Sequence, residues 1–306
     1  MSAIRAGKVN VAESLTLRGK LLVDEPMSRH TSWRVGGTAD YYYIPADLAD
    51  LQCYLASLEP RTAINWVGLG SNMLVRDGGI RGVVIAPLNA LKLIELHADG
   101  SIYVEAGVTC AKLAKFCQKN DLAGGDFLAG IPGTVGGALA MNAGAFGSET
   151  WPFVERVRMI NRLGQLLERA AAEFDVAYRQ VSQFPDEWFA AGYFRFAPKS
   201  AGLESSIRQL LDQRNDSQPI GLPSGGSVFK NPAGHHAAKL IQGAGLKGHM
   251  QGDARVSEKH ANFIISSEQT SAADIEALIK YIQQTVKQQF NVELETEVRI
   301  LGQDSS

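Results

Sequence analysis

Glycines and small apolar residues crowd one stretch of the sequence, Gly130 to Gly147, in a way that suits phosphate binding. The stretch reads Gly-Ile-Pro-Gly-Thr-Val-Gly-Gly-Ala-Leu-Ala-Met-Asn-Ala-Gly-Ala-Phe-Gly. An ordinary helix is not expected here, because each interior glycine costs about 1 kcal/mol relative to alanine. Backbone N–H groups in tight glycine turns form a concave site for an anion, usually a phosphate. We favour this phosphate cradle, with a glycine-rich packing corner as the alternative.

A second glycine turn, Gly68-Leu-Gly70-Ser71-Asn72, follows a short strand predicted over 64–67. Two glycines and two small polar side chains directly after a strand are a common way to hold a pyrophosphate. The turn is not the dinucleotide fingerprint, because no glycine stands at position 73. A plain strand–turn–strand connection explains it equally well. Together the two turns predict a phosphate-bearing cofactor without naming it.

Other catalytic signatures are missing from the sequence. A P-loop needs Gly-Lys-Ser or Gly-Lys-Thr at a fixed spacing, and neither occurs. His-Glu-x-x-His and Cys-x-x-Cys are also missing, so we expect no catalytic metal. His235 and His236 are interpreted as unrelated surface histidines, because adjacent helical side chains point apart. Cys53, Cys110 and Cys117 are odd in number and are interpreted as buried thiols.

The elements that would position these turns alternate as short strands, glycine turns and helices, which indicates an α+β fold rather than a regular βαβ repeat. Capping residues and hydrophobic periodicity predict helices over 47–58, 109–120, 205–215, 237–244 and 271–290. The last begins at a capping box of Ser271 and Asp274. Its apolar face should bury Ile275, Leu278, Ile279, Ile282, Val286 and Phe290.

Alternating apolar residues predict strands over 32–35, 41–44, 64–67, 82–85, 154–161, 165–169, 188–198 and 292–300. A hairpin around Asp99-Gly100 should join 92–97 to 101–106. The composition becomes small and polar near 199–202, and we place a domain boundary there.

Composition limits the kind of protein. The chain has 306 residues, a formal net charge of −2 and 20% charged residues, which is ordinary globular composition. No basic stripe stands out, so we expect no nucleic-acid partner. No run of 18 apolar residues occurs and the N-terminus has no signal-peptide core, so we expect no membrane span and a cytoplasmic location. We expect a monomer that acts on small molecules.

Six motifs then stand in chain order and resemble one family. They read His30-Thr-Ser-Trp-Arg-Val-Gly-Gly37, Gly70-Ser-Asn-Met-Leu-Val75, Ala129-Gly-Ile-Pro-Gly-Thr-Val-Gly-Gly-Ala-Leu-Ala-Met-Asn-Ala-Gly144, Gly226-Ser-Val-Phe-Lys-Asn-Pro232, Val256-Ser-Glu-Lys-His-Ala-Asn262 and Leu294-Glu-Thr-Glu-Val-Arg299. The sequence resembles the UDP-N-acetylenolpyruvoylglucosamine reductase (MurB) family from about Met27 to Gly302.

The resemblance implies a fold and a reaction. The fold is a two-lobed FAD-binding domain of the vanillyl-alcohol-oxidase/PCMH type over 1–200, with lobes of about 1–58 and 59–200. A smaller α+β substrate domain follows over 201–306, and its last strand, 292–301, returns toward the active site. The implied reaction is NADPH-dependent reduction of UDP-N-acetylglucosamine enolpyruvate to UDP-N-acetylmuramate through non-covalent FAD, in peptidoglycan precursor synthesis.

Family roles are carried over residue by residue. Arg179 matches the arginine that clamps the substrate carboxylate, Ser227 the serine taken as proton donor, and Glu297 the glutamate that assists protonation and carboxylate binding. Without the family, Arg179 would be an exposed strand arginine and Ser227 a turn serine. Periodicity cannot distinguish Glu297 from Glu293 and Glu295 on the same polar face.

Further contacts are expected with cofactor and substrate. The substrate candidates are Lys230, Asn231 and, more weakly matched, Arg214. The residues expected to contact FAD are Gly68, Gly70, Ser71, Asn72, Met73, Gly130, Ile131, Pro132, Gly133, Thr134, Gly136, Gly137, Asn142 and Ala143.

Two departures from the family pattern matter. The usual Tyr-Arg-x-Ser reads Tyr178-Arg-Gln-Val181, so the expected hydroxyl is missing or displaced to Ser182. The segment from Arg179 to Ser227 is short and lacks the tyrosine-bearing loop of one branch, which places this chain with the type II branch. The rival functions are another PCMH-type flavin oxidase and a non-catalytic nucleotide-sugar or flavin-binding module; the module would require Arg179, Ser227 and Glu297 to lie apart.

Overall fold

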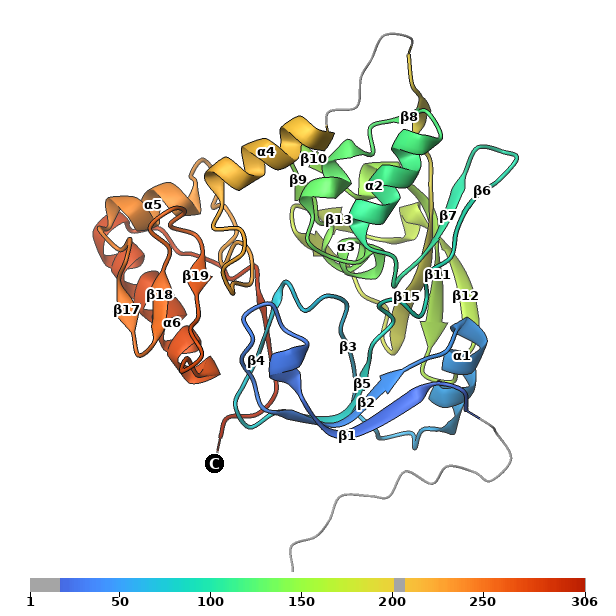
Figure 1. The fold of residues 1–306 in the computed structure, drawn as a ribbon, viewed down its shortest axis with the longest axis horizontal. Coiled ribbons are helices and arrows are strands. Elements are labelled where there is room, and N and C mark those ends of the chain that lie inside the picture. Colours follow the sequence, from blue (N-terminus) through green and yellow to red (C-terminus); the bar gives the residue numbers. More distant parts are fainter. Residues whose placement is uncertain (1–16, 201–206, 306) are drawn as a thin grey trace, which may run out of the picture.

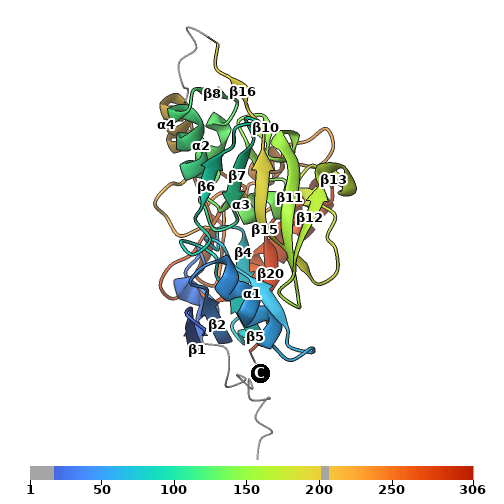
Figure 2. The ribbon, with the colours of Figure 1, turned by 90° about the vertical axis from the view of Figure 1, so that its right-hand side faces the viewer.

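The computed structural model describes residues 17–200 and 207–305 (Figure 1). The N-terminal stretch without a signal-peptide core lies largely outside these residues, as do residues 201–206 at the expected domain boundary. Two large sheets and a C-terminal unit make up the described part, and Figure 2 shows the second sheet above the first. The α+β expectation is confirmed by this mixture of elements.

The first sheet has the strand order β1-β2-β5-β3. Its strands are β1 (Lys20–Pro26), β2 (Thr38–Ile44), β5 (Ile80–Ile85) and β3 (Ile64–Trp66). The β1–β2 pair is antiparallel, whereas β5 pairs in parallel with both β2 and β3. Helix α1 (Leu48–Ser57) covers one side and begins at the expected cap, because the Asp47 side chain accepts from the Asp50 N–H. The 3-10 turn η1 (Met27–Arg29) links β1 to the loop before β2.

The expected lobe boundary near residue 58 is wrong. Strands β3 and β5 lie after that position, yet they belong to the first sheet. Parallel strands need a crossover connection, so this lobe must include α1 and the chain beyond it. The first lobe therefore runs through Ile85.

The second sheet is antiparallel throughout, with the order β12-β11-β15-β7-β6. Its strands are β6 (Ile94–Leu96), β7 (Ile102–Glu105), β11 (Val154–Asn161), β12 (Leu166–Ala170) and β15 (Glu187–Phe194). The hairpin expected at Asp99-Gly100 is the β6–β7 pair. The smaller elements of this lobe are β8 (Leu122–Ala123), η2 (Asp126–Gly130), β9 (Gly144–Ala145), β10 (Ser148–Glu149), η3 (Trp151–Phe153), η4 (Ala171–Glu173), β13 (Val176–Ala177), β14 (Gln180–Val181) and β16 (Ala197–Pro198).

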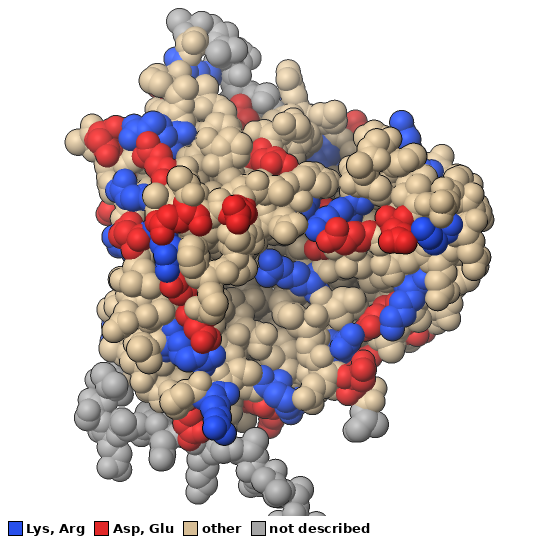
Figure 3. All heavy atoms as spheres, turned by 180° about the vertical axis from the view of Figure 1, so that it is seen from behind, with Lys and Arg blue, Asp and Glu red and all other residues tan. Residues whose placement is uncertain are grey.

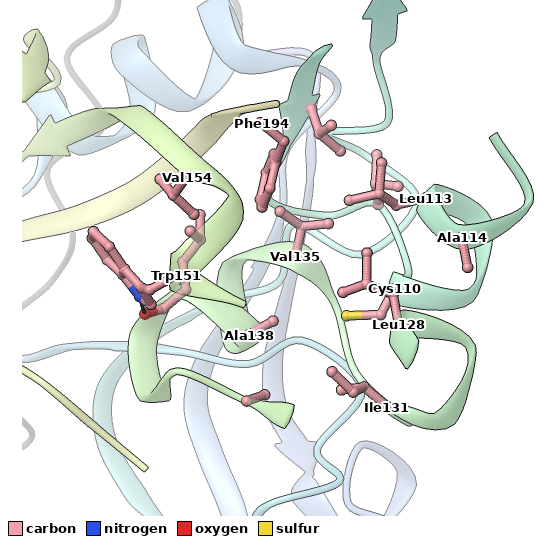
Figure 4. Packing of buried hydrophobic residues seen from close by; sticks show 14 of the residues in the cluster. Cys110, Leu113, Ala114, Leu128, Ile131, Val135, Ala138, Trp151, Val154 and Phe194 are labelled. Atoms are coloured by element: carbon pink, nitrogen blue, oxygen red, sulfur yellow. Dashed lines mark hydrogen bonds between the residues drawn. The ribbon is translucent and has the colours of Figure 1, made fainter. Parts of the chain in front are cut away.

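Two helices pack against this sheet and close its core. Helix α2 (Cys110–Lys119) starts at Thr109, whose side chain accepts from the Lys112 N–H. Helix α3 (Val135–Met141) contacts β15 and β7. Figure 4 shows Val135 at the centre of the buried cluster, between Phe194 of β15 and Cys110 of α2.

The expectation that the glycine stretch avoids an ordinary helix is wrong for α3. The Thr134 side chain caps the helix through the Gly137 N–H, and Asn142 ends it in the left-handed region at φ 48°. Both glycines, Gly136 and Gly137, lie in the first turn. A Cβ on Gly136 would lie 2.8 Å from the Ala106 Cβ, so glycine lets the helix approach β7 closely.

The C-terminal unit consists of α4 (Ile207–Ser217), α5 (Ala237–Gly243), β17 (Met250–Gln251), β18 (Ala254–Val256), β19 (Ile264–Ile265) and α6 (Ala272–Phe290). In this unit α5 and α6 pack with the small sheet, whereas α4 contacts η2 of the second lobe. The capping box of Ser271 and Asp274 is present as expected. The apolar face of α6 is buried as expected except at Phe290, which is 40% exposed at the end of the helix.

The last segment of the chain returns to the first lobe (Figure 1). Strand β20 (Arg299–Leu301) pairs in parallel with β4 (Met73–Val75), which directly follows the Gly68–Asn72 turn. The strand expected over 292–300 is shorter than the pattern suggested. Upstream of β20 the chain instead meets the 228–230 segment through an isolated bridge between Phe229 and Thr296.

One tryptophan joins the first lobe to the C-terminal unit. The strand expected over 32–35 is a turn in which Arg34 has φ 58°, and this turn directs Trp33 away from the first sheet. The Trp33 side chain is fully buried in the C-terminal core, and its Nε1–H donates to the Ile264 carbonyl at 2.8 Å. Asp77 adds a second link, because its carboxylate accepts the N–H groups of Ala272 and Ala273 at the start of α6. Among the described helices, none is long and apolar enough to cross a membrane.

The shared core predicts that Trp33→Ala destabilises the protein by about 3–5 kcal/mol, because a large buried side chain and its hydrogen bond are lost. Urea unfolding followed by circular dichroism measures the change. Leu163→Ala is the control, since Leu163 is 64% exposed and its loss should change stability by less than about 0.5 kcal/mol. Equal stability of the two variants would contradict the shared core.

Candidate active site

Two cavities adjoin where the glycine turns meet the C-terminal unit. The large cavity, of about 460 Å³, extends from β3 and β15 to both glycine turns. The adjoining cavity, of about 380 Å³, lies between the Gly130 segment, α4 and the 225–227 loop. Ser71, Asn72, Ile131, Met141 and Ala143 line both. These five residues therefore form the boundary between two parts of one recess.

Most residues expected to contact the cofactor line this recess. Those on the large cavity are Gly68, Gly70, Ser71, Asn72, Met73, Ile131, Gly133, Thr134, Gly136, Gly137 and Ala143. Gly130 and Pro132 line the adjoining cavity.

Asn142 lines neither cavity. Its side chain is buried, and its amide donates to Glu149 Oε2 at 2.7 Å and to the Ala177 carbonyl at 3.2 Å. Its Oδ1 accepts the Trp151 N–H. A cofactor contact from this side chain is not supported by the geometry, because its hydrogen-bonding groups hold the end of α3 and the end of β13 together.

Gly70 and Gly133, both expected to contact FAD, differ in what an added side chain would meet. Gly70 has φ 63°, and an added Cβ would collide with the His30 carbonyl, so the protein itself requires glycine there. Gly133 has no such requirement, because an added Cβ would meet only Ile131 Cγ2 at 3.6 Å and Ser71 Oγ at 3.9 Å. The space in front of Gly133 is thus left open toward the large cavity.

Arg179 is held at the tip of a tight hairpin. Strands β13 and β14 pair Ala177 with Gln180, which leaves Tyr178-Arg179 as a two-residue turn with Arg179 at φ 56°. This left-handed conformation is strained for a non-glycine residue. The guanidinium donates to the carbonyls of Asn142 and Gly144 and, at 3.0 Å, to Glu297 Oε1. The backbone and these three bonds fix the direction of Arg179.

Glu297 comes from the C-terminal part of the chain and lines the adjoining cavity, which Arg179 also lines. Its N–H donates to the Val228 carbonyl, and its own carbonyl accepts from Asn72 Nδ2, so the C-terminal segment is fastened to both neighbours. Only 13% of its side chain is exposed. Burial raises the pKa of Glu297 above its ordinary value, while Arg179 and Lys230 oppose that shift.

Ser227 lies in the loop that follows Gly225 and Gly226. Gly226 has φ 74°, and a Cβ on Gly225 would press on the Trp33 ring at 2.5 Å, so both glycines shape the loop. Asn262 holds the next residues, because its side chain bonds both the N–H and the carbonyl of Phe229. Among the described residues, no side chain or backbone group bonds the Ser227 hydroxyl, which lines the adjoining cavity with Arg179 and Glu297.

The three substrate candidates do not share one cavity. Arg214 of α4 lines the adjoining cavity, and burial lowers its pKa. Lys230 and Asn231 line a third cavity of about 260 Å³, together with Tyr178. Lys230 is paired with Glu295 at 2.6 Å. Asn231 Oδ1 accepts the Ala237 N–H and so caps α5.

Val181 stands where the family pattern has serine, so β14 contributes no hydroxyl to the recess. Val181 is buried in the core of the second lobe. The Ser182 hydroxyl accepts the Asp175 N–H at 2.9 Å and closes the hairpin from its far end. The serine is therefore not displaced into the site.

The sequence reasoning missed Arg299. It is the one Lys or Arg among the described residues that line the large cavity. The polar face of the last strand carries Glu293, Glu295, Glu297 and Arg299 alike, so periodicity gave no signal. The parallel pairing of β20 with β4 would have pointed to it.

The recess fits FAD. Pockets of several hundred cubic ångströms with apolar walls and a few polar groups are typical of cofactor sites. The backbone at Gly133 and Gly137 is open enough for close approach of a phosphate, since a Cβ at either would meet protein atoms no nearer than 3.6 Å.

Comparison with known proteins identifies the two parts of the chain. Residues 39–169 match the FAD binding domain family, and residues 218–301 match the C-terminal domain of UDP-N-acetylenolpyruvoylglucosamine reductase. The fold and site are thus those of a flavin-dependent oxidoreductase.

Close relatives define the family. UDP-N-acetylenolpyruvoylglucosamine reductase from Coxiella burnetii is 52% identical, with 94% of this chain and 97% of the relative covered. That from Methylococcus capsulatus is also 52% identical, with 94% of each covered. The crystal structure of the Thermus caldophilus enzyme, MurB, superposes with a TM-score of 0.78 at 27% identity, covering 92% of this chain and 98% of that one. This chain belongs to the UDP-N-acetylenolpyruvoylglucosamine reductase family.

The open space at Gly133 predicts that Gly133→Val weakens FAD binding at least tenfold, because the new side chain would occupy the position expected for a phosphate. Unfolding of the FAD-free protein should change by less than about 0.5 kcal/mol, since few protein atoms are touched. Gly70→Ala is the contrasting variant, and its strained backbone should cost about 1–3 kcal/mol or more in the FAD-free protein. Fluorescence titration with FAD and urea unfolding measure both. Full FAD affinity in Gly133→Val would favour the packing-corner interpretation.

Proposed function

We propose that this chain catalyses the NADPH-dependent reduction of UDP-N-acetylglucosamine enolpyruvate to UDP-N-acetylmuramate, with FAD as cofactor, in peptidoglycan precursor synthesis. One observation carries the proposal. Arg179, Ser227 and Glu297 come from three distant parts of the chain, and all three line the cavity that adjoins the glycine turns. Family membership supplies the reaction, and this cluster supplies groups suited to it.

The glycine turns at 68–72 and 130–137 would hold FAD. The N–H groups of the 68–72 turn would face its phosphates, because those of Gly133, Gly136 and Gly137 already donate within the protein. When bound, FAD supplies hydride chemistry, accepting a hydride from NADPH and delivering one to the vinyl carbon of the substrate. The chain's own residues have the remaining tasks. They bind the substrate carboxylate, stabilise the charge that gathers on it, and deliver a proton to the adjacent carbon.

Arg179 is suited to bind the carboxylate. A guanidinium has five N–H donors in a planar fork. Three bonds to Asn142, Gly144 and Glu297 orient it and leave donors for a substrate. A fork fixed in this way can bond both oxygens of a carboxylate and stabilise the enolate-like charge that follows hydride addition.

Ser227 is suited to deliver the proton. Its hydroxyl lines the same cavity and has no hydrogen bond to the described protein groups, so it is free to point at substrate carbon. Glu297 is the second proton-bearing candidate, because burial raises its pKa. A buried carboxyl beside Arg179 can also help to orient the substrate carboxylate.

The substrate diphosphate and sugar require cations beyond Arg179. Arg214 is such a cation inside the adjoining cavity. Lys230 and Asn231 lie in the third cavity beside Tyr178 of the Arg179 hairpin. We propose that the nucleotide part of the substrate extends from one cavity toward the other along this side of the hairpin.

The rival functions fit less well. A non-catalytic binding module would not need a proton donor, a carboxylate and a fixed guanidinium on one cavity. Another flavin oxidase would have no use for a carboxylate clamp paired with Ser227. Anaerobic reduction by NADPH followed by reoxidation with the enolpyruvyl substrate separates the enzyme from the oxidase.

We further propose that the enzyme works in the cytoplasm as a monomer, without nucleic-acid or membrane partners. The support is that one chain provides every group of the proposed site. On the face drawn in Figure 3, positive and negative side chains alternate around a central hollow, and no single-sign patch suited to a polyanion covers that face.

The decisive experiment is anaerobic stopped-flow of the two half-reactions in wild type and Ser227→Ala. Wild type should bleach with NADPH and regain its yellow colour with UDP-N-acetylglucosamine enolpyruvate. Removing the proton donor should leave bleaching nearly unchanged and slow reoxidation by roughly 10²–10⁴-fold. Wild type that is not reoxidised by this substrate would refute the function. An unaltered reoxidation rate in Ser227→Ala would make Glu297 the better candidate for the acid.

The raised pKa of Glu297 predicts that protons are taken up when the substrate binds. The substrate adds a carboxylate and a diphosphate to a cavity where Glu297 already has a raised pKa, and like charges raise it further. Protons should therefore be taken up at pH values between the pKa of the free enzyme and that of the complex, with no uptake well above or below both.

Calorimetric titration of the oxidised holoenzyme between pH 5 and 8, in buffers of different ionisation enthalpy, measures this uptake. Glu297→Gln should abolish it. Glu295→Gln should retain it, because Glu295 is 73% exposed and lines the third cavity, not the one that Arg179 and Glu297 line. Uptake that persists in Glu297→Gln would assign the proton to another group.

A further inference from the structure

The charged side chains that line the large cavity differ in whether they have a partner of opposite charge. Its lining includes two carboxylates, Asp186 and Glu187, and each is already paired: Asp186 with Arg162 at 2.9 Å and Glu187 with Arg169 at 2.7 Å. Arg299 is the one cation on the lining among the described residues. Within these residues no carboxylate lies within salt-bridge distance of it.

Arg299 has little to compensate its charge within the protein. Its one side-chain hydrogen bond to a described group goes from Nη2 to the Ala140 carbonyl, at 3.1 Å. Solvent reaches it from the cavity, yet surrounding protein desolvates the guanidinium and lowers its pKa. Arg299 is nevertheless an exposed residue, and an arginine stays charged in proteins. With no carboxylate partner among the described residues, its guanidinium has N–H donors left for an anion bound in the cavity.

Its position is fixed by the backbone and not by a flexible loop. The Arg299 N–H donates to the Asn72 carbonyl at the end of the first glycine turn, and Arg299 is paired with Met73 across β20 and β4. Glu297 lies two residues earlier, so the two Cα atoms are no more than about 7 Å apart. Arg299 therefore stands beside Asn72, one of the residues that line both cavities.

We propose that Arg299 is the cationic partner of a negative charge on bound FAD, so that the C-terminal unit takes part in holding the cofactor. The inference rests on FAD as the cofactor of the proposed function. Two parts of FAD carry such a charge: the diphosphate in every state, and the ring system once it is reduced and has lost its N1 proton. The sequence matched by the FAD binding domain family, 39–169, does not include this residue.

The test compares wild type with Arg299→Gln and Arg299→Lys, measuring the dissociation constants of oxidised and reduced FAD and the two-electron midpoint potential. With the diphosphate as partner, Arg299→Gln should bind both forms at least tenfold more weakly, with a weaker salt dependence and an unchanged potential. With the reduced ring as partner, it should lose affinity for reduced FAD specifically. Each tenfold preferential loss lowers the potential by about 30 mV. Arg299→Lys should recover part of either effect.

Arg255→Gln is the matched control, since Arg255 of β18 is an exposed arginine of the same unit outside the large cavity. It should keep both affinities and the potential. Urea unfolding of the FAD-free variants separates misfolding from lost binding. Wild-type affinities and potential in Arg299→Gln would overturn the proposal while leaving the proposed function intact. Normal FAD binding with no reoxidation by the enolpyruvyl substrate would overturn the function and leave Arg299 in place.

Discussion

The parallel pairing of β20 with β4 is the constraint on which the site depends. Three residue pairs, from Arg299–Met73 to Leu301–Val75, join the end of the chain to the strand that follows the first glycine turn. This register sets Glu297 against Arg179 and Arg299 against the large cavity. A shift by one residue would turn these side chains to the opposite face. The chemistry of the recess is thus decided by a very short piece of sheet.

The groups around Arg179 show how the fold prepares a charged site without substrate. Its backbone is strained, its guanidinium is bonded to two carbonyls, and its charge is balanced by Glu297. Asn142, which contacts neither cavity, ties α3 to the hairpin that carries Arg179. A side chain oriented in advance loses less conformational freedom when a ligand binds. Residues behind the site therefore matter as much as those that face it.

Local features such as helix caps could be predicted from the sequence, whereas contacts between distant segments could not. Asp47 and Ser271 each cap the helix they were expected to cap, because capping depends only on neighbours in the chain. The lobe boundary was wrong, because parallel pairing of β5 with β2 has no local signature. Gly70 and Gly133 look alike in the sequence. The structure shows that packing requires glycine only at Gly70, where a Cβ would collide with the His30 carbonyl. Arg299 was missed because its cavity is built by several segments that lie far apart in the chain.

The shared core around Trp33 has a consequence for synthesis of the protein. Trp33 leaves the ribosome early, but its hydrogen-bond partner Ile264 is 231 residues later. Domains generally form in the order of their synthesis, so the first sheet can assemble before the C-terminal unit. Until that unit folds, Trp33 and the edge of β4 stay exposed. An exposed tryptophan beside an unpaired strand is the kind of surface that chaperones bind and that nascent chains aggregate through. The active site is therefore completed in the same step that buries this surface. That step requires the C-terminal unit and β20 to have been synthesised.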